Sequence, residues 1–159
     1  MIRHPAALLC LLLVAGCSSV TIVRDEENPA RQPFQEGVTV TFQAGSSGAS
    51  PGQFFVPGQK FVIEYISATA GVPAGSGQNL QASITLFVGG IGMQSFLGPF
   101  TPIGRGPLGV PTDLFTLGQV VRLYADPNSL LRIDAVRTNG SSGEAFINVR
   151  LVGHLVAVP

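Results

Sequence analysis

Very few side chains in this sequence could act as a nucleophile, a base or a metal ligand. Of the two histidines, only His154 lies outside the first few residues, and the only cysteines are Cys10 and Cys17. A Ser-His-Asp site needs a histidine beside its serine, and no Gly-x-Ser-x-Gly segment occurs in the chain. One imidazole without a second strong ligand cannot hold zinc. We therefore interpret His154 as a structural or solvent-facing residue, and we expect no metal and no cofactor.

Two carboxylates, Glu64 and Asp134, are the candidates for acid or base catalysis of the kind that glycosidases perform with a carboxylate pair. Glu64 lies within the almost wholly apolar segment 61–67, so we expect it to be at least partly buried. A buried carboxylate needs compensation, for which Arg122 and Arg150 are the natural partners. This favours a structural ion pair over a catalytic acid and predicts that Glu64→Ala is strongly destabilising.

Nothing in the composition indicates a nucleic-acid or sugar-binding surface directly. Nine basic residues balance nine acidic ones, which leaves no basic face for nucleic acid. The chain has no tryptophan, and its two tyrosines, Tyr65 and Tyr124, lie in apolar segments where we expect them in the core. A glycan would then have to bind through the glycine-rich loops expected at 45–52, 71–77 and 98–109.

The N-terminal segment MIRHPAALLCLLLVAGC is typical of an export signal. Its apolar run, residues 6–15, is too short for a transmembrane helix, which needs about 20 residues. The tetrapeptide Val-Ala-Gly-Cys at 14–17 resembles the lipobox of bacterial lipoproteins. That resemblance implies cleavage before Cys17, acylation of Cys17 and anchoring of the exported protein to the bacterial cell envelope, with the outer membrane as the expected location. An ordinary signal peptide cleaved nearby is the alternative.

We expect three parts in the chain: a signal peptide at 1–16, a flexible tether at 17–37 and a β-sandwich domain at 38–159. The tether holds the densest charge in the sequence, residues 24–27, together with two prolines. Adjacent carboxylates in such a segment indicate a solvated linker rather than a metal site. Cleavage would leave Cys17 as the only cysteine, so no internal disulfide is expected.

From residue 38 onward the apolar residues recur with a period of two, which predicts β-strands and no helix. Turns at 126–129 and 138–143 predict two successive hairpins, and 102–107 is expected to be an irregular loop. Eight or nine strands separated by turns predict an all-β, antiparallel β-sandwich, with a jelly roll as the first choice of topology and a barrel as the second. The expected strands are 38–42, 54–56, 61–67, 80–88, 120–125, 130–137 and 145–156, with weaker candidates at 93–97 and 115–117.

Three segments carry a resemblance to known proteins: VPGQKFVIEYISA at 56–68, VRLYADP at 121–127 and VGHLV at 152–156. They are similar to a family of uncharacterised secreted bacterial proteins that share a VPxGKxxVIExVSA strand, an RLYADP turn and a terminal GYLV. The resemblance spans 55–156 and implies secretion, but it carries no activity that could be transferred to this chain.

The combined hypothesis is a lipid-anchored envelope module that is not an enzyme and has a binding or structural role. Its expected partners are the membrane, through lipidated Cys17, and an unknown envelope protein or glycan, with no nucleic acid. The alternative is a hydrolase acting on polysaccharide through Glu64 or Asp134. A second carboxylate near Glu64 would favour the hydrolase, whereas an arginine would favour a structural role.

Overall fold

The computed structural model describes residues 31–49, 51–88, 91–106, 111–138 and 143–157, and this part of the chain contains nine strands and no helix. No helix in these residues is long and apolar enough to cross a bilayer. Cys17 and the predicted signal peptide lie outside the described residues. The strands are β1 (Arg31–Phe42), β2 (Gly52–Phe55), β3 (Lys60–Pro73), β4 (Leu80–Val88), β5 (Ile91–Phe96), β6 (Thr101–Arg105), β7 (Thr112–Ala125), β8 (Leu130–Arg137) and β9 (Ala145–Val156).

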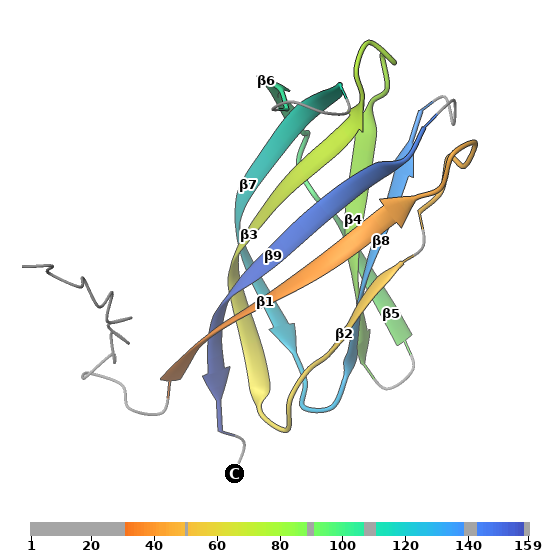
Figure 1. Ribbon diagram of the computed structural model, residues 1–159. Helices are drawn as coiled ribbons and strands as arrows, with labels where there is room; N and C mark the ends of the chain where they lie inside the picture. The colour runs from red at the N-terminus through yellow and green to blue at the C-terminus, as the bar shows by residue number, and fades with distance from the viewer. Residues whose placement is uncertain (1–30, 50, 89–90, 107–110, 139–142, 158–159) are drawn as a thin grey trace, which may run out of the picture.

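The strands form two antiparallel sheets packed face to face, which confirms the predicted β-sandwich (Figure 1). The five-stranded sheet has the order β1-β9-β3-β7-β6, and the four-stranded sheet has the order β2-β8-β4-β5. The first four strands therefore pair with partners that follow in reverse chain order: β1 with β9, β2 with β8, β3 with β7 and β4 with β5. A long hairpin rolled into two sheets in this way is a jelly roll, with β6 added at one edge.

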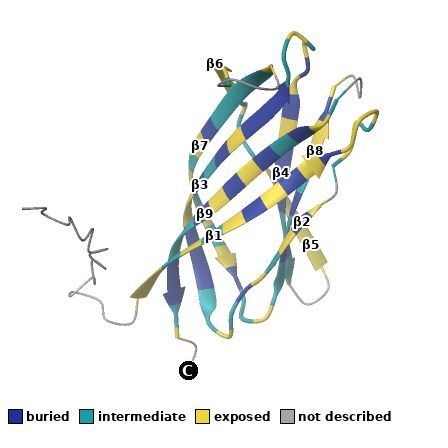
Figure 2. Cartoon of the chain, viewed as in Figure 1, coloured by how far each residue is buried: buried dark blue, intermediate teal, exposed yellow. Residues whose placement is uncertain are grey.

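Alternation along the strands builds the core between the sheets. In β1, Val38, Val40 and Phe42 are buried while the threonines between them are exposed. The same alternation is visible as bands along the strands in Figure 2. Because side chains of successive residues point to opposite faces of a sheet, the remaining positions lie on the outer faces. The side chains on the outer face of the five-stranded sheet are therefore available to form a binding site.

Strand β1 begins at Arg31, so the predicted boundary between tether and domain at residue 37 is wrong. Residues 31–37 pair with 150–156 of β9, and this pairing is made by the backbone, which polar side chains do not prevent. The apolar anchor of this extension is Phe34, which packs against the core and meets the ring of Phe61 edge-on with the centroids 5.0 Å apart.

Both predicted hairpins are also wrong. Strand β8 belongs to the four-stranded sheet, whereas β7 and β9 belong to the five-stranded one, so the chain changes sheet at the turn 126–129 and again between β8 and β9. Residues 139–142 of the second predicted turn lie outside the described residues. Turn residues specify a reversal of direction and do not specify whether the next strand pairs with the previous one. The expected loop at 102–107 overlaps β6, where Pro102 is tolerated because an edge strand has backbone groups that need no partner.

Candidate functional site

A groove with several charged side chains lies on the outer face of the five-stranded sheet. It is at the end of the sandwich where β1 begins and β9 finishes, and Figure 1 shows these two strand ends. Its volume is about 380 Å³. We call it the basic groove, and it is lined by Arg31, Lys60, Val62, Glu64, Arg122, Tyr124, His154 and Val156.

The register of the strands brings these residues together. Val156 of β9 lies between Arg31 of β1 and Lys60 of β3. Neighbouring strands are about 4.8 Å apart, so β1 and β7 lie roughly 14 Å from each other across β9 and β3. Long side chains from both can therefore reach over the strands between them. In the next row, His154 and Tyr124 both lie opposite Val62.

Glu64 lies in the groove at a β-bulge of β3. The register of β3 shifts between Ile63 and Tyr65 against both neighbouring strands, so Glu64 is the extra residue relative to β9. A bulge places two consecutive side chains on one side of a strand. Glu64 shares the outer face with Val62 by regular alternation, the bulge brings Tyr65 to the same face, and the Glu64 side chain is 55% exposed. The prediction that Glu64 is partly buried is therefore wrong, because the apolar neighbour expected on its face, Ile66, lies in the core and Tyr65 takes its place on the outer face.

The partner of Glu64 is a histidine and neither of the two predicted arginines. Nδ1 of His154 lies 3.3 Å from a carboxylate oxygen of Glu64. Arg122 lines the same groove but forms no ion pair with Glu64, and Arg150 lies farther along β9. His154 is itself buried, which agrees with a structural residue rather than a solvent-facing one. Its Nε2 has no hydrogen-bond partner among the described residues and can donate or accept according to the tautomer.

Positive charge dominates the groove. Three cations, Arg31, Lys60 and Arg122, surround the single carboxylate of Glu64. Lys60 has a distant partner, Asp126 at 3.9 Å, and its ammonium group lies 5.7 Å from the centroid of the Tyr124 ring. Within the described part of the chain, Arg31 and Arg122 form no ion pair.

A larger depression of about 520 Å³ lies on the same face, farther along β9. Its floor is made of small residues such as Gly37 and Ser67, which flank Arg150 on the two neighbouring strands. Arg150 is exposed there, four residues or roughly 13 Å along the strand from His154. No carboxylate lines this depression among the described residues.

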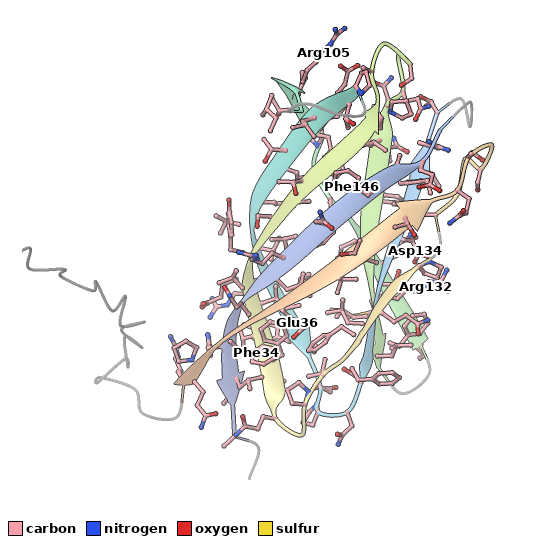
Figure 3. All side chains as sticks on the ribbon, in the orientation of Figure 1. Phe34, Glu36, Arg105, Arg132, Asp134 and Phe146 are labelled. Atoms are coloured by element: carbon pink, nitrogen blue, oxygen red, sulfur yellow. The ribbon has the colours of Figure 1, made fainter. Side chains whose placement is uncertain are left out.

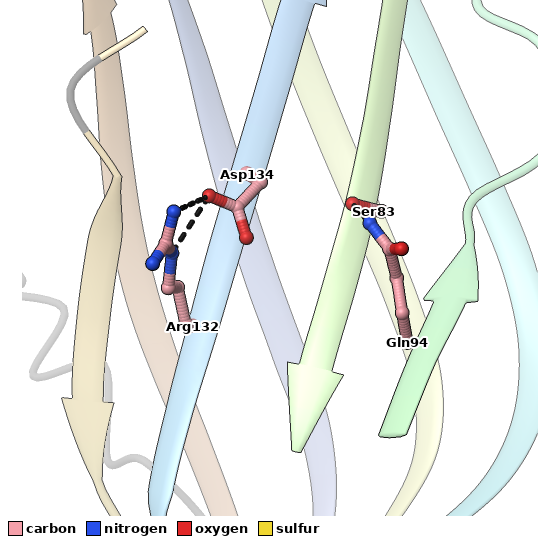
Figure 4. A network of polar contacts seen from close by, with 4 residues as sticks. All are labelled: Ser83, Gln94, Arg132 and Asp134. Carbon is pink, nitrogen blue, oxygen red and sulfur yellow. Dashed lines mark hydrogen bonds and ion pairs between the residues drawn. The ribbon is translucent and has the colours of Figure 1, made fainter. Parts of the chain in front are cut away.

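Asp134 lies on the opposite side of the molecule from Glu64. It is on the outer face of β8, where Nε of Arg132 donates to its carboxylate at 2.7 Å (Figure 4). Nearby, the Gln94 amide donates to the hydroxyl of Ser83 at 2.9 Å. Glu64 and Asp134 belong to different sheets and cannot form a catalytic pair across one cleft. No group of three or more metal-ligating side chains occurs in the described residues.

The two tyrosines lie on the outer face of the five-stranded sheet and not in the core as expected. Tyr65 and Tyr124 are 41% and 47% exposed. The apolar neighbours that suggested burial lie on the other face of each strand. One signal could have revealed the basic groove: all of its lining residues except Arg31 come from the segments 56–68, 121–127 and 152–156 that carry the family resemblance.

Because Glu64 is exposed, we expect Glu64→Ala to change the free energy of unfolding by less than about 1 kcal/mol, as for other exposed ion pairs. Urea denaturation of the two proteins measures this difference. A loss of several kcal/mol would show that the carboxylate is needed to support the buried His154 ring.

No family model matches the chain, and no curated protein matches it. The similarity of 55–156 to the family of secreted bacterial proteins stays a prediction, and so does the lipoprotein signal.

Proposed function

We propose that this protein is a lipid-anchored module of the bacterial cell envelope that binds an acidic glycan in the basic groove and does not catalyse its cleavage. The observation that supports this proposal is the convergence of Arg31, Lys60 and Arg122 from three different strands around one exposed carboxylate. Such a groove carries a net positive charge although the chain as a whole is neutral. An anionic ligand is therefore the complementary partner.

The other groups of the groove favour a saccharide over a simple anion. Glu64 can accept hydrogen bonds from sugar hydroxyls, and Nε2 of His154 is available for one more. The ring of Tyr124 offers a flat, partly apolar surface at the edge of the groove. Arg150 in the neighbouring depression would meet a second acidic group if the ligand is a polymer. Uronic acid oligomers carry hydroxyls and a carboxylate on every sugar, so one oligomer could contact both the basic groove and Arg150.

Binding fits the groove better than hydrolysis does. Glycoside hydrolysis uses two carboxylates, about 5 to 10 Å apart. Among the residues that line the basic groove, only Glu64 is a carboxylate, and Asp134 lies on the other sheet. No observation in the described residues favours the hydrolase alternative.

The chain enters β1 at the end of the molecule that carries the groove. The chain from Cys17 to Arg31 can reach at most roughly 50 Å even when fully extended. Arg31 is both the first residue of β1 and a lining residue of the basic groove. An acylated Cys17 would therefore keep the groove within reach of envelope glycans close to the membrane surface.

Replacing Cys17 by serine should release the protein from the membrane fraction, because the acylated residue is lost. Fractionation of cells and metabolic labelling with a fatty acid measure this effect. Wild-type protein should be labelled and sediment with membranes, whereas Cys17→Ser should be unlabelled. Labelled Cys17→Ser protein would contradict the proposed anchor. Cys10→Ser, within the signal peptide, is the matched control and should be labelled like the wild type.

A further inference from the structure

Strand β5 is the unprotected edge of the four-stranded sheet. It pairs with β4 on one side, and all six of its residues are exposed. Three of them are large and apolar: Ile91, Met93 and Phe96 are 72%, 58% and 74% exposed. The strand contains no charged residue and no proline. Its outer backbone N–H and C=O groups can therefore pair with another strand.

The other three sheet edges carry features that oppose such pairing. Strand β1 has Pro33 and two charged residues, and β6 has Pro102, a register shift and Arg105. Strand β2 has only four residues. Prolines, charges, irregularities and short length are the ways in which natural sheets block edge-to-edge contact. Strand β5 has none of the first three and is longer than β2.

The exposed apolar residues of β5 also mark an uncovered border of the core. Met93 lies opposite Leu86 of β4, which is buried between the sheets, so Met93 faces the same side. Ile91 lies two residues before Met93 and shares its face. Both would be covered if the sheet continued beyond β5.

We propose that β5 pairs antiparallel with β5 of a second copy of this chain, which would join two four-stranded sheets into one continuous sheet. A two-fold contact brings a surface against itself, so charges of one sign would meet their own kind. An edge without any charge avoids this repulsion. In the register that we propose, the core-facing side chains of both copies lie on the same face of the joined sheet. Met93 is then opposite Met93 of the second copy, and Ile91 is opposite Ser95. The contact does not involve the basic groove, which lies on the other sheet.

Cross-linking tests this register directly. The full chain is used with Cys10 and Cys17 both replaced by alanine, so that an introduced cysteine is the only thiol and acylation plays no part. In detergent solution under mild oxidation, Met93→Cys should form a disulfide dimer. The matched control is Val120→Cys, since Val120 is 83% exposed on the outer face of the five-stranded sheet. It should form at least fivefold less dimer.

Light scattering provides a second readout without cross-linking. The cysteine-free parent should have twice the protein mass of a monomer, and Met93→Lys should be a monomer because it places two ammonium groups together on the two-fold axis. Equal cross-linking of the two cysteine variants, or a parent that is monomeric at tens of micromolar, would overturn the proposal.

Discussion

Replacing Arg137 by leucine should lower the free energy of unfolding by about 3–5 kcal/mol, because several backbone carbonyl groups lose the donors of one buried side chain at once. Arg137 ends β8 and is 3% exposed. Its Nε donates to the carbonyl of Ser46 at 2.7 Å, and its Nη2 donates to the carbonyl of Gln43 at 2.8 Å. Both terminal nitrogens also donate to the carbonyl of Gly143 at 3.0 Å. The guanidinium group lies 5.3 Å from the centroid of the Phe42 ring.

One side chain thus joins the segment after β1, the end of β8 and the segment before β9. Urea denaturation measures the loss, and Arg132→Leu is the matched control on the same strand. Arg132 pairs with Asp134 at the surface, so its replacement should cost less than about 1 kcal/mol. Equal losses in the two variants would show that the hydrogen bonds of Arg137 contribute no more than an exposed ion pair.

Gly153→Ala should be about as damaging, with an expected loss of about 3 kcal/mol or more. A Cβ atom on Gly153 would overlap the carbonyl oxygen of Val62 and lie only 3.0 Å from Cα of Ile63. These are backbone atoms next to the bulge at Glu64 in the groove. They cannot move away without breaking the pairing of β3 with β9.

The matched control is Gly58→Ala, because a Cβ at Gly58 would have no atom within 4 Å. Circular dichroism and denaturation should show a normal fold and a normal midpoint for Gly58→Ala and a strongly lowered midpoint for Gly153→Ala. If Gly153→Ala is as stable as the wild type, the close approach of β9 to the bulge is incorrect.

The strands of the core could be predicted from the sequence because their burial repeats every two residues. Apolar alternation predicts β1 through Val38, Val40 and Phe42, and it predicts β4 from Leu80 to Leu86. The same rule, applied past Ala135, would have placed Arg137 on the buried face of β8. Strand pairing could not be predicted in this way. The same turn residues as those at 126–129 occur both in hairpins and in connections between two sheets. The start of β1, residues 31–37, was also missed. These residues pair with β9 through their backbone, and their mostly polar side chains show no apolar alternation that would predict a strand.

The candidate site was harder to predict than the fold. Glu64 was expected to pair with an arginine inside the protein, but it lies on the outer face with Val62, and the bulge places Tyr65 on that face and Ile66 in the core. A bulge depends on the facing strand, here on Gly153, and is not visible in β3 alone. The basic groove joins residues from 31 to 156, which only the jelly-roll order of β1, β9, β3 and β7 brings together.

Titration with a galacturonic acid oligomer tests the proposed binding function most directly. The two tyrosines are a built-in probe, since the chain has no tryptophan and Tyr124 lines the groove. Tyrosine fluorescence of the detergent-solubilised full chain should change in a saturable way, and the affinity should fall with added salt.

Arg122→Gln should bind at least tenfold more weakly, whereas the control Arg105→Gln, at the far end of the molecule from the groove (Figure 3), should bind like the wild type. Arg150→Gln should weaken binding of the oligomer but not of monomeric galacturonate. An affinity that is the same for a neutral galactose oligomer, or that Arg122→Gln leaves unchanged, would contradict an acidic-glycan site in the basic groove.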